Sequence, residues 1–289
     1  MTAGGARPLA IDLDGCVAIV TGAGAGIGRG IALSLAGCGA HVAVIDIDAA
    51  RAEQTTTDAR AFGREALALP ADVMDTDSLR AAVRAVDGHF GRIDALVNNA
   101  GGVASRRFLD QSERSWRRHI DINLVSMLAM TAASVPVMIR EGRGGSVLNI
   151  ASIEATRAAP TFAVYAACKA GMVSFTRTMA VELAEHDVRV NALAPDWTRT
   201  PGNSGLRRGP VPDELPERPP EVRELLEAYV PLGREGTVEE IGQVAAFLCS
   251  PLAGYVTGAV IPVDGGTWAS SGWTRAGERW SLFGHDHPM

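Results

Sequence analysis

Paired cysteines, basic clusters and long apolar runs are all lacking in this sequence, and each absence excludes a class of protein. The four cysteines are scattered without C-x-x-C spacing, which favours inert thiols in a reducing compartment. The net charge of -6 and the lack of a basic cluster argue against a nucleic-acid-binding surface. No run of about eighteen apolar residues occurs, so no membrane-spanning helix is expected. The N-terminus lacks a signal-peptide profile, and we expect a soluble cytoplasmic protein.

The chain does contain the composition of an ordinary globular protein, with 47% hydrophobic and 21% charged residues in 289. Short continuous apolar runs alternate with amphipathic stretches, which is typical of a parallel sheet covered by helices on both faces. The strands predicted in this way are Val17–Thr21, Val42–Asp46, Glu65–Pro70, Ala95–Asn98, Ser146–Ala151, Arg189–Ala194 and Ala259–Val263. Right-handed crossovers then predict an α/β fold, a doubly wound parallel sheet of the Rossmann type, in a single domain over residues 1–289.

Two regions interrupt this alternation. The segment Pro201–Pro231 holds seven prolines, too many for one regular helix, although Glu221–Tyr229 is compatible with a short one. A long irregular insertion in a compact domain favours a lid over a site, and a mobile surface loop is the alternative. The tail, residues 268–289, carries three tryptophans and Phe283, so we expect it to pack on the body or on a partner subunit.

A glycine-rich turn, residues 21–28 (TGAGAGIG), lies between the first predicted strand and a helix expected over Ile27–Ala36. The turn departs from the strict G-x-G-x-x-G spacing. Its glycines still allow a tight turn and a close approach to a pyrophosphate, and the helix that begins near Gly26 points free N–H groups at it. A strand-to-helix turn that binds nothing is the alternative.

Asp46 ends the second predicted strand, eighteen residues after Gly28. A carboxylate at this point accepts hydrogen bonds from the adenosine ribose hydroxyls and repels a 2′-phosphate. Neither Ala25 nor Ile47 supplies a cation to balance such a phosphate, so the sequence favours NAD over NADP. An aspartate that only caps a turn is the alternative.

Further motifs follow along the chain. Four polar positions are, in order, Asn123, Ser152, Tyr165 and Lys169. The accompanying segments are 98–101 (NNAG), 255–258 (YVTG) and 263–266 (VDGG). With these motifs and the glycine turn, the chain resembles the short-chain dehydrogenase/reductase family, in its shorter single-domain branch, over about residues 14–267.

This resemblance implies which residues meet the coenzyme. In relatives the pair Asp72-Val73 contacts adenine, the NNAG segment supports the sheet, and Thr200 meets the nicotinamide carboxamide. The implied cofactor-binding residues are Gly22, Gly24, Gly26, Ile27, Gly28, Asp46, Ile47, Asp72, Val73, Asn99, Ala100, Gly101, Tyr165, Lys169, Pro195, Trp197 and Thr200. The resemblance also implies a homotetramer or a homodimer, with the helices near Asn123 and Tyr165 at the interfaces.

The chain departs from the family pattern after the sixth strand. Where the family usually has Pro-Gly, this chain has Pro195-Asp196, and we expect the aspartate to adopt the turn conformation of that glycine. Trp197 follows where an aliphatic residue is usual, which predicts a bulkier wall beside the nicotinamide. Cys168 precedes Lys169 where a serine is common, and we interpret it as small and buried.

Tyr165 and Lys169 form a Y-x-x-x-K pair that predicts proton transfer, because at i and i+4 of a helix expected over Ala163–Glu185 they share one face. A nearby ammonium favours the phenolate and brings a phenol, of free pKa about 10, toward the range of a general acid or base. Ser152 is placed to hydrogen-bond the reacting oxygen. The resemblance adds that Lys169 binds the nicotinamide ribose and that Asn123 holds a water in a proton relay.

The predicted function is an NAD-dependent oxidoreductase that interconverts a secondary alcohol and a ketone, with Tyr165 as general acid/base. Apolar residues near the site favour a ring or steroid-like substrate, whereas Glu154 and Arg157 favour a sugar-like polyol. An epimerase or dehydratase with bound NAD, and a dinucleotide-binding sensor or scaffold, are the alternatives. No metal site is expected, because H-E-x-x-H is absent and His285 and His287 have no third ligand in view.

Overall fold

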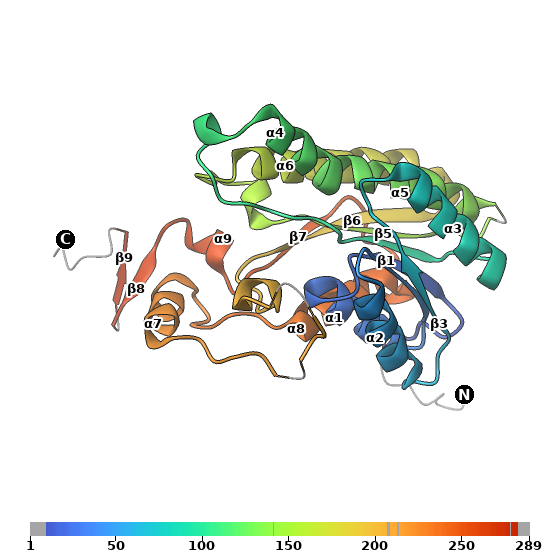
Figure 1. The fold of residues 1–289 in the computed structure, drawn as a ribbon, viewed down its shortest axis with the longest axis horizontal. Helices are drawn as coiled ribbons and strands as arrows, with labels where there is room; N and C mark the ends of the chain where they lie inside the picture. The colour runs from blue at the N-terminus through green and yellow to red at the C-terminus, as the bar shows by residue number, and fades with distance from the viewer. Residues whose placement is uncertain (1–9, 141, 207–208, 213, 278, 283–289) are drawn as a thin grey trace, which may run out of the picture.

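Seven parallel strands form the central sheet of the protein, in the order β3-β2-β1-β4-β5-β6-β7 (Figure 1). The structure is a computed structural model that describes residues 10–140, 142–206, 209–212, 214–277 and 279–282. The strands are β1 (Val17–Thr21), β2 (His41–Asp46), β3 (Ala66–Pro70), β4 (Ala95–Asn98), β5 (Gly145–Ile150), β6 (Val188–Pro195) and β7 (Val260–Val263). The single-domain, doubly wound α/β fold predicted from the sequence is confirmed.

Helices cover both faces of this sheet, as Figure 1 shows. One side holds α3 (Thr76–Phe90), α4 (Glu113–Ile120), α5 (Ser126–Ile139) and α6 (Ala163–Glu182). The other side holds α1 (Gly26–Gly37), α2 (Ala49–Arg60) and α8 (Val238–Cys249). Each side has its own hydrophobic cluster, so every residue of β1 is buried. Continuous apolar strands, rather than alternating ones, follow from that two-sided burial.

The order of the strands determines where a ligand site forms. The chain runs from β1 outward through β2 to β3, returns to pair β4 with β1, and then continues to β7. At this reversal the loops that follow β1 and β4 separate to opposite sides, which leaves a crevice at the carboxyl ends of the strands. The glycine turn follows β1, the NNAG segment follows β4, and Ser152 follows β5.

A chain of buried polar side chains ties the middle of the sheet to two helices. The Asn98 Nδ2 donates to Asn149 Oδ1 at 2.9 Å and to Thr131 Oγ1 at 3.2 Å. The Asn149 Nδ2 in turn donates to Thr176 Oγ1 at 2.9 Å. These bonds join β4 and β5 to α5 and α6, so the first asparagine of the NNAG segment stabilises the sheet from within.

The helical segment Glu113–Ile139, which contains α4 and α5, is long and apolar enough to cross a membrane by length and composition. Helix α5 packs on α3, β4 and β5, and 39% of the most apolar part of the segment is buried inside the protein. Residues Asp121–Val125 form a π-helical turn between the two helices. The segment therefore serves as a covering layer of the sheet.

Helix α7 (Pro220–Tyr229) of the proline-rich segment lies together with the tail beyond one end of the sheet (Figure 1), whereas Leu206, Gly209 and Val211 of the same segment contact α2. Within the proline-rich segment, a 3-10 turn spans Gly202–Ser204. In the tail, α9 (Thr267–Ser270) precedes a hairpin of β8 (Thr274–Ala276) and β9 (Arg279–Ser281). Strand β8 contacts α7, and Arg275 donates to the Pro231 carbonyl at 2.9 Å. Phe283, His285 and His287 lie outside the described residues.

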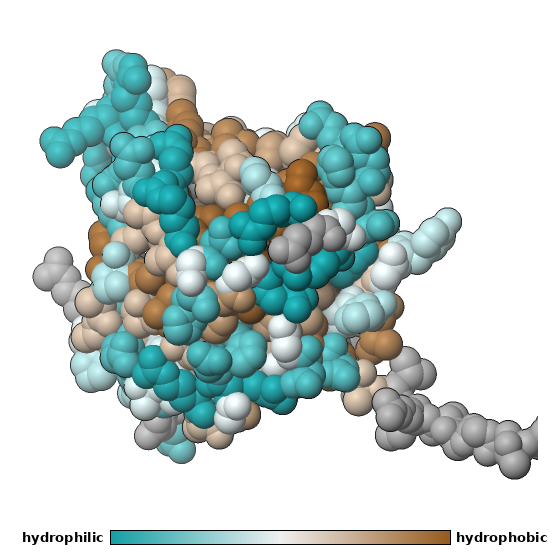
Figure 2. Space-filling model, turned by 90° about the vertical axis from the view of Figure 1, so that its right-hand side faces the viewer, coloured by the Kyte–Doolittle hydropathy of each residue, from teal (hydrophilic) through white to brown (hydrophobic). Residues whose placement is uncertain are grey.

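Figure 2 views the molecule from the side on which α2, α3 and β3 lie. Hydrophilic residues cover much of this face, and hydrophobic ones gather between them. Helices α2 and α3 begin with aspartate caps, Asp48 and Asp75, each of which accepts hydrogen bonds from two backbone N–H groups. In each of these two helices, a side chain therefore satisfies two of the first backbone N–H donors.

Candidate active site

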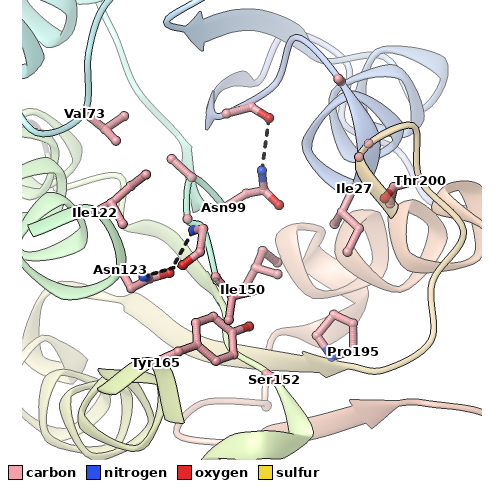
Figure 3. Close-up of a pocket in the computed structure, with 18 of the residues that line it drawn as sticks. Ile27, Val73, Asn99, Ile122, Asn123, Ile150, Ser152, Tyr165, Pro195 and Thr200 are labelled. Carbon is pink, nitrogen blue, oxygen red and sulfur yellow. Dashed lines mark hydrogen bonds between the residues drawn. The ribbon is translucent and has the colours of Figure 1, made fainter. Parts of the chain in front are cut away.

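One cavity of about 830 Å³ lies in the crevice at the carboxyl edge of the sheet. It brings together all four of the polar residues predicted as catalytic, Asn123, Ser152, Tyr165 and Lys169. The predicted cofactor residues that also line it are Gly22, Gly26, Ile27, Asp46, Ile47, Asp72, Val73, Asn99, Ala100, Gly101, Pro195, Trp197 and Thr200. Gly24 and Gly28 are the exceptions. Figure 3 shows Tyr165 and Ser152 across the cavity from Ile27 and Thr200.

Gly22 and Gly28 are required by the shape of the glycine turn. Gly22 has φ of +62°, in the left-handed region that favours glycine. A Cβ added to Gly28 would lie 2.3 Å from the Gly22 carbonyl oxygen and 2.4 Å from Asn99 Nδ2. Gly28 thus lets the turn close on itself, and its contribution to the site is packing beneath the cavity.

The helix that follows this turn begins without a cap. The residue at its N-cap is Ala25, and no side chain bonds to the first-turn N–H groups of α1. By contrast, α2, α3, α4 and α8 are capped by Asp48, Asp75, Ser112 and Thr237. The N–H groups of α1 are therefore left for an anion, and the residues present fit a dinucleotide pyrophosphate.

Asp46 is held in place at the end of β2. Its Oδ2 accepts from the Gly24 N–H at 2.8 Å, and its Oδ1 accepts from the Asp48 N–H at 2.9 Å. The backbone N–H of Gly24 therefore orients the Asp46 carboxylate. Asp46 lines the cavity, and its fixed carboxylate suits a ribose diol.

Arg51 was missed by the sequence analysis. It lies in the first turn of α2 and lines the cavity beside Asp46 and Ile47. Its guanidinium donates to the carbonyls of Gly209 at 2.7 Å and Leu206 at 3.2 Å, which belong to the proline-rich segment. A cation five residues after the strand-end aspartate was the available signal.

The NNAG segment fastens the glycine turn to β4. The Asn99 Nδ2 donates to the Thr21 carbonyl at 2.9 Å and to the Gly22 carbonyl at 3.1 Å (Figure 3). The backbone N–H groups of Asn99 and Ala100 both donate to Thr21 Oγ1 at 3.0 Å. Since these bonds link the two loops of the crevice, the wall facing the dinucleotide is built before any ligand binds.

Tyr165 and Lys169 share one face of α6, as their spacing predicts. The Lys169 Nζ lies 5.6 Å from the centre of the Tyr165 ring and donates to the Ile150 carbonyl at 2.6 Å. Burial lowers the pKa of Lys169 from 10.5 to about 8, an effect that Cys168 partly opposes. The ammonium thus titrates close to neutral pH.

The pKa of Tyr165 differs from the sequence-based expectation of an acidified phenol. Burial raises it, hydrogen bonding with Ser152 lowers it, and the charges of Glu154 and Asp196 raise it further. Sequence spacing identified the neighbouring ammonium but carried no information on this desolvation. Ser152 Oγ also accepts from the Glu154 N–H at 3.2 Å, which orients its lone pairs.

Asn123 is fully buried, and hydrogen bonds occupy its side chain. Its Nδ2 donates to the carbonyls of Gly102 at 2.8 Å and His119 at 2.9 Å, and its Oδ1 accepts from the Gly102 N–H at 3.1 Å. The residue lies in the π-helical turn, where the wider backbone ladder is typical of functional sites. Its side chain therefore fixes the loop after β4 against the helix.

The backbone conformation after β6 corrects one expectation. Trp197 has a positive φ of +25°, whereas Asp196, which was expected to adopt the conformation of the glycine, does not have a positive φ. A non-glycine residue at positive φ is strained by about 1–3 kcal/mol, and the surrounding packing has to maintain it. Trp197 packs against Tyr229 of α7, with ring centres 6.2 Å apart.

Asp196 is half-buried on the same wall and is not a simple replacement for glycine. Burial raises its pKa to about 6, the Trp197 N–H and the charge of Arg157 act in the opposite direction, and Glu154 and Asp264 raise it. Its position beside the residues predicted as catalytic was visible in the sequence only as a departure from Pro-Gly. Cys168 is buried, as predicted, and burial raises the pKa of its thiol.

Comparisons with known proteins agree with this geometry. A family model described as enoyl-(acyl carrier protein) reductase matches residues 22–267. The chain is 38% identical to galactitol 2-dehydrogenase of Agrobacterium fabrum, over 89% of this chain and 99% of that one. The chain belongs to the short-chain dehydrogenase/reductase family. It is also 37% identical to the 3-oxoacyl-[acyl-carrier-protein] reductase FabG of Thermotoga maritima, over 88% of this chain and 98% of the relative.

One solved structure that is similar to this chain contains bound ligands. It is 7α-hydroxysteroid dehydrogenase complexed with NADH and 7-oxo glycochenodeoxycholic acid, with a TM-score of 0.81 and 34% identity. The match covers 89% of this chain and 95% of that one. The protein is therefore an oxidoreductase of alcohol or ketone substrates that uses a nicotinamide dinucleotide.

Proposed function

We propose that this short-chain dehydrogenase/reductase is an NAD-dependent enzyme that interconverts a secondary alcohol and a ketone. The observation that carries the proposal is the convergence of Ser152, Tyr165 and Lys169 on the cavity that holds the glycine turn and Asp46. When bound, the nicotinamide ring accepts or donates the hydride. A coenzyme site and a proton-transfer site in one cavity suit a reaction that moves both.

The residues of the chain divide the remaining work. In alcohol oxidation Tyr165 accepts the hydroxyl proton, and in ketone reduction it returns it. Ser152 hydrogen-bonds the reacting oxygen and stabilises charge that develops there. Lys169, whose Nζ lies 5.6 Å from the centre of the Tyr165 ring, takes part in the onward transfer of the proton, which its lowered pKa of about 8 suits. Asn123 positions the loop that faces Lys169.

The choice of NAD over NADP follows from the surroundings of Asp46. Its carboxylate is fixed by two backbone N–H groups where the adenosine ribose would lie, and its charge repels a 2′-phosphate. Arg51, the nearby cation, already donates to two carbonyls of the proline-rich segment and lies 3.8 Å from Asp48. The 2′-phosphate would have to displace those contacts.

We also propose a role for the proline-rich segment, a role for the tail, and an oligomeric state and compartment for this enzyme. Residues 201–231 form a substrate lid, because Tyr229 of that segment accepts a hydrogen bond from Arg157 at 2.7 Å at the site. The aromatic tail supports that lid through the contact of β8 with α7. The enzyme is a homotetramer or a homodimer, a proposal that rests on the family. It is cytoplasmic, a proposal that rests on its four free thiols.

Names of relatives suggest where the substrate search should begin. One relative is a galactitol 2-dehydrogenase and one solved relative was crystallised with NADH and a bile acid derivative. Polyols and hydroxysteroids therefore both belong in the test, together with simple cyclic alcohols.

The test is an absorbance assay for NADH formation with purified enzyme, NAD or NADP, and a panel of secondary alcohols. The proposal predicts turnover with a higher kcat/KM for NAD than for NADP. Turnover only with NADP would overturn the choice of coenzyme. Dinucleotide binding without turnover of any alcohol or ketone would favour a sensor or scaffold, and epimerised or dehydrated products without net NADH would favour the other alternative.

A further inference from the structure

An ion-pair network at Arg157 joins three segments that are distant in the sequence. The Arg157 Nη2 lies 2.7 Å from Glu154 Oε1 and 3.5 Å from Asp196 Oδ2. The Nη1 of the same guanidinium donates to the Tyr229 hydroxyl at 2.7 Å. The network connects the loop after β5, the loop after β6 and the lid helix α7.

The network lies at the boundary between two cavities. Asp196 lines the central cavity together with Ser152 and Tyr165. Glu154, Arg157 and Tyr229 line a second cavity of about 880 Å³. Burial raises the pKa of Tyr165 and the Ser152 hydrogen bond lowers it. The charges of Glu154 and Asp196, which are smaller effects, also raise it. Both carboxylates are therefore close enough to influence the atoms at which the reaction occurs.

The charges of the network do not balance. Two carboxylates share one guanidinium, and the side chains of Glu154, Asp196 and Arg157 are 19%, 15% and 28% exposed. Asp264 adds further negative potential at Asp196. Since each ionised carboxylate accepts about four hydrogen bonds, both retain capacity for donors from a ligand. Arg157 is already engaged by three partners, so an anionic ligand meets repulsion here and hydroxyl groups meet acceptors.

The second cavity offers room for a carbon skeleton beyond these acceptors. Its remaining lining is largely small, apolar or aromatic and includes Ala158, Ala159, Pro160, Phe162 and Trp268. A substrate that reacts at Tyr165 and extends past Glu154 and Asp196 would place its next carbon atoms in this space.

On the basis of the function proposed above, we propose that Glu154 and Asp196, held by Arg157, accept hydrogen bonds from hydroxyl groups near the reacting carbon and make the enzyme selective for uncharged polyols. The specificity-determining residues are then Glu154 and Asp196, and Arg157 is a positioning residue that fixes both carboxylates. A purely structural network that fastens the lid is the competing interpretation, and the two interpretations predict different patterns across substrates.

The experiment compares a neutral hexitol, the aldonate that carries a carboxylate at its end, and cyclohexanol. The wild type, Glu154→Gln and Asp196→Asn are measured with NAD at about pH 8, above the pKa of about 6 that burial gives Asp196. The matched control is Glu227→Gln, an exposed carboxylate on the same helix as Tyr229. Ratios of kcat/KM between substrates within one variant cancel any change in Tyr165 itself.

The proposal predicts that the wild type prefers the hexitol to the aldonate by about tenfold or more. Each site variant should lower that ratio by about tenfold, and the ratio of kcat/KM for the hexitol to that for cyclohexanol should also fall, whereas Glu227→Gln should change neither ratio. An aldonate used as well as the hexitol, a ratio that survives in both site variants, or equal losses for all three substrates would overturn the inference.

The same assay distinguishes a failure of the polyol inference from a failure of the proposed function. Cyclohexanol turnover without hexitol turnover would overturn the polyol inference and leave the alcohol dehydrogenase intact. No turnover of any alcohol, with either coenzyme, would overturn the proposed function and the inference that rests on it.

Discussion

The two walls of the central cavity are built in different ways. The wall that faces the dinucleotide follows β1, β2 and β4 and is held by backbone hydrogen bonds, close glycine packing and Asn99. The wall that faces the substrate follows β5 and β6 and includes α7, and it is held by the side chains of Arg157, Glu154, Asp196 and Tyr229.

This difference separates what the fold requires from what the individual enzyme selects. Backbone contacts on the dinucleotide wall depend on a few glycines and on strand order, so any chain with this topology can repeat them. Side-chain contacts on the substrate wall join residues that are far apart in the sequence, so the fold alone does not determine which residues stand there. The substrate wall is therefore where we expect the substrate preference of this enzyme to be determined.

The largest expected effect concerns Tyr165, the proposed proton-transfer group, which lies between the two walls. Replacing Tyr165 by Phe should lower kcat by a factor on the order of 10²–10⁴, because the transferable proton is lost. NAD affinity, measured by titration calorimetry, should stay nearly unchanged. The exposed Tyr255→Phe variant is the control. Retained turnover in Tyr165→Phe would show that proton transfer does not depend on this residue.

The next effect concerns stability and arises from the burial of Lys169. Its pKa is about 8 in the folded protein and 10.5 ordinarily, so the unfolded chain binds more protons between these values. The free energy of unfolding contributed by this residue should therefore rise with pH across that window, by about 3 kcal/mol in all. Chemical denaturation of wild type and Lys169→Met at several pH values isolates the contribution, since other groups cancel. A difference independent of pH would contradict it.

A smaller effect is expected on the dinucleotide wall. Asp46→Ala removes the acceptor for the ribose hydroxyls and the charge that repels a 2′-phosphate. The ratio of kcat/KM for NAD to that for NADP should fall by about tenfold to hundredfold. Asp77→Ala, an exposed change on α3, should leave the ratio unaltered. An unchanged ratio in Asp46→Ala would place coenzyme selection elsewhere, and Arg51 would be the next residue to change.

The smallest effect links the two walls. Asp196 raises the pKa of Tyr165, so Asp196→Asn should move the rising limb of the kcat/KM profile for cyclohexanol oxidation to lower pH. The maximal rate should change little, because Asn keeps the shape of the side chain. A profile that stays in place, or moves to higher pH, would argue that the charge of Asp196 does not reach the phenol.

The strands and the dinucleotide cavity could be predicted from the sequence. Continuous apolar runs placed all seven strands to within a residue or two, as β1 and β4 show. The motif positions and the family resemblance then predicted that Asp46, Ser152 and Tyr165 belong to one site. Local patterns were sufficient here because parallel strands bring the loops at their carboxyl ends together.

The substrate wall was harder to predict because its contacts join distant positions. Arg157 and Tyr229 lie 72 residues apart, and nothing in either local sequence indicates their hydrogen bond. The positive φ of Trp197, assigned to Asp196 from the family pattern, depends on tertiary packing rather than on residue type. The raised pKa of Tyr165 depends on burial, which spacing along a helix does not reveal.

The uncapped beginning of α1 has a thermodynamic consequence. A helix whose first amides lack an internal acceptor gains one when a pyrophosphate arrives, so the coenzyme completes an element of secondary structure as well as supplying chemistry. Occupancy and resistance to heat are then linked by mass action. Coenzyme at a hundred times its dissociation constant would add about 2.7 kcal/mol to the free energy of unfolding. The protein is accordingly expected to be most durable in the cell when its coenzyme pool is full.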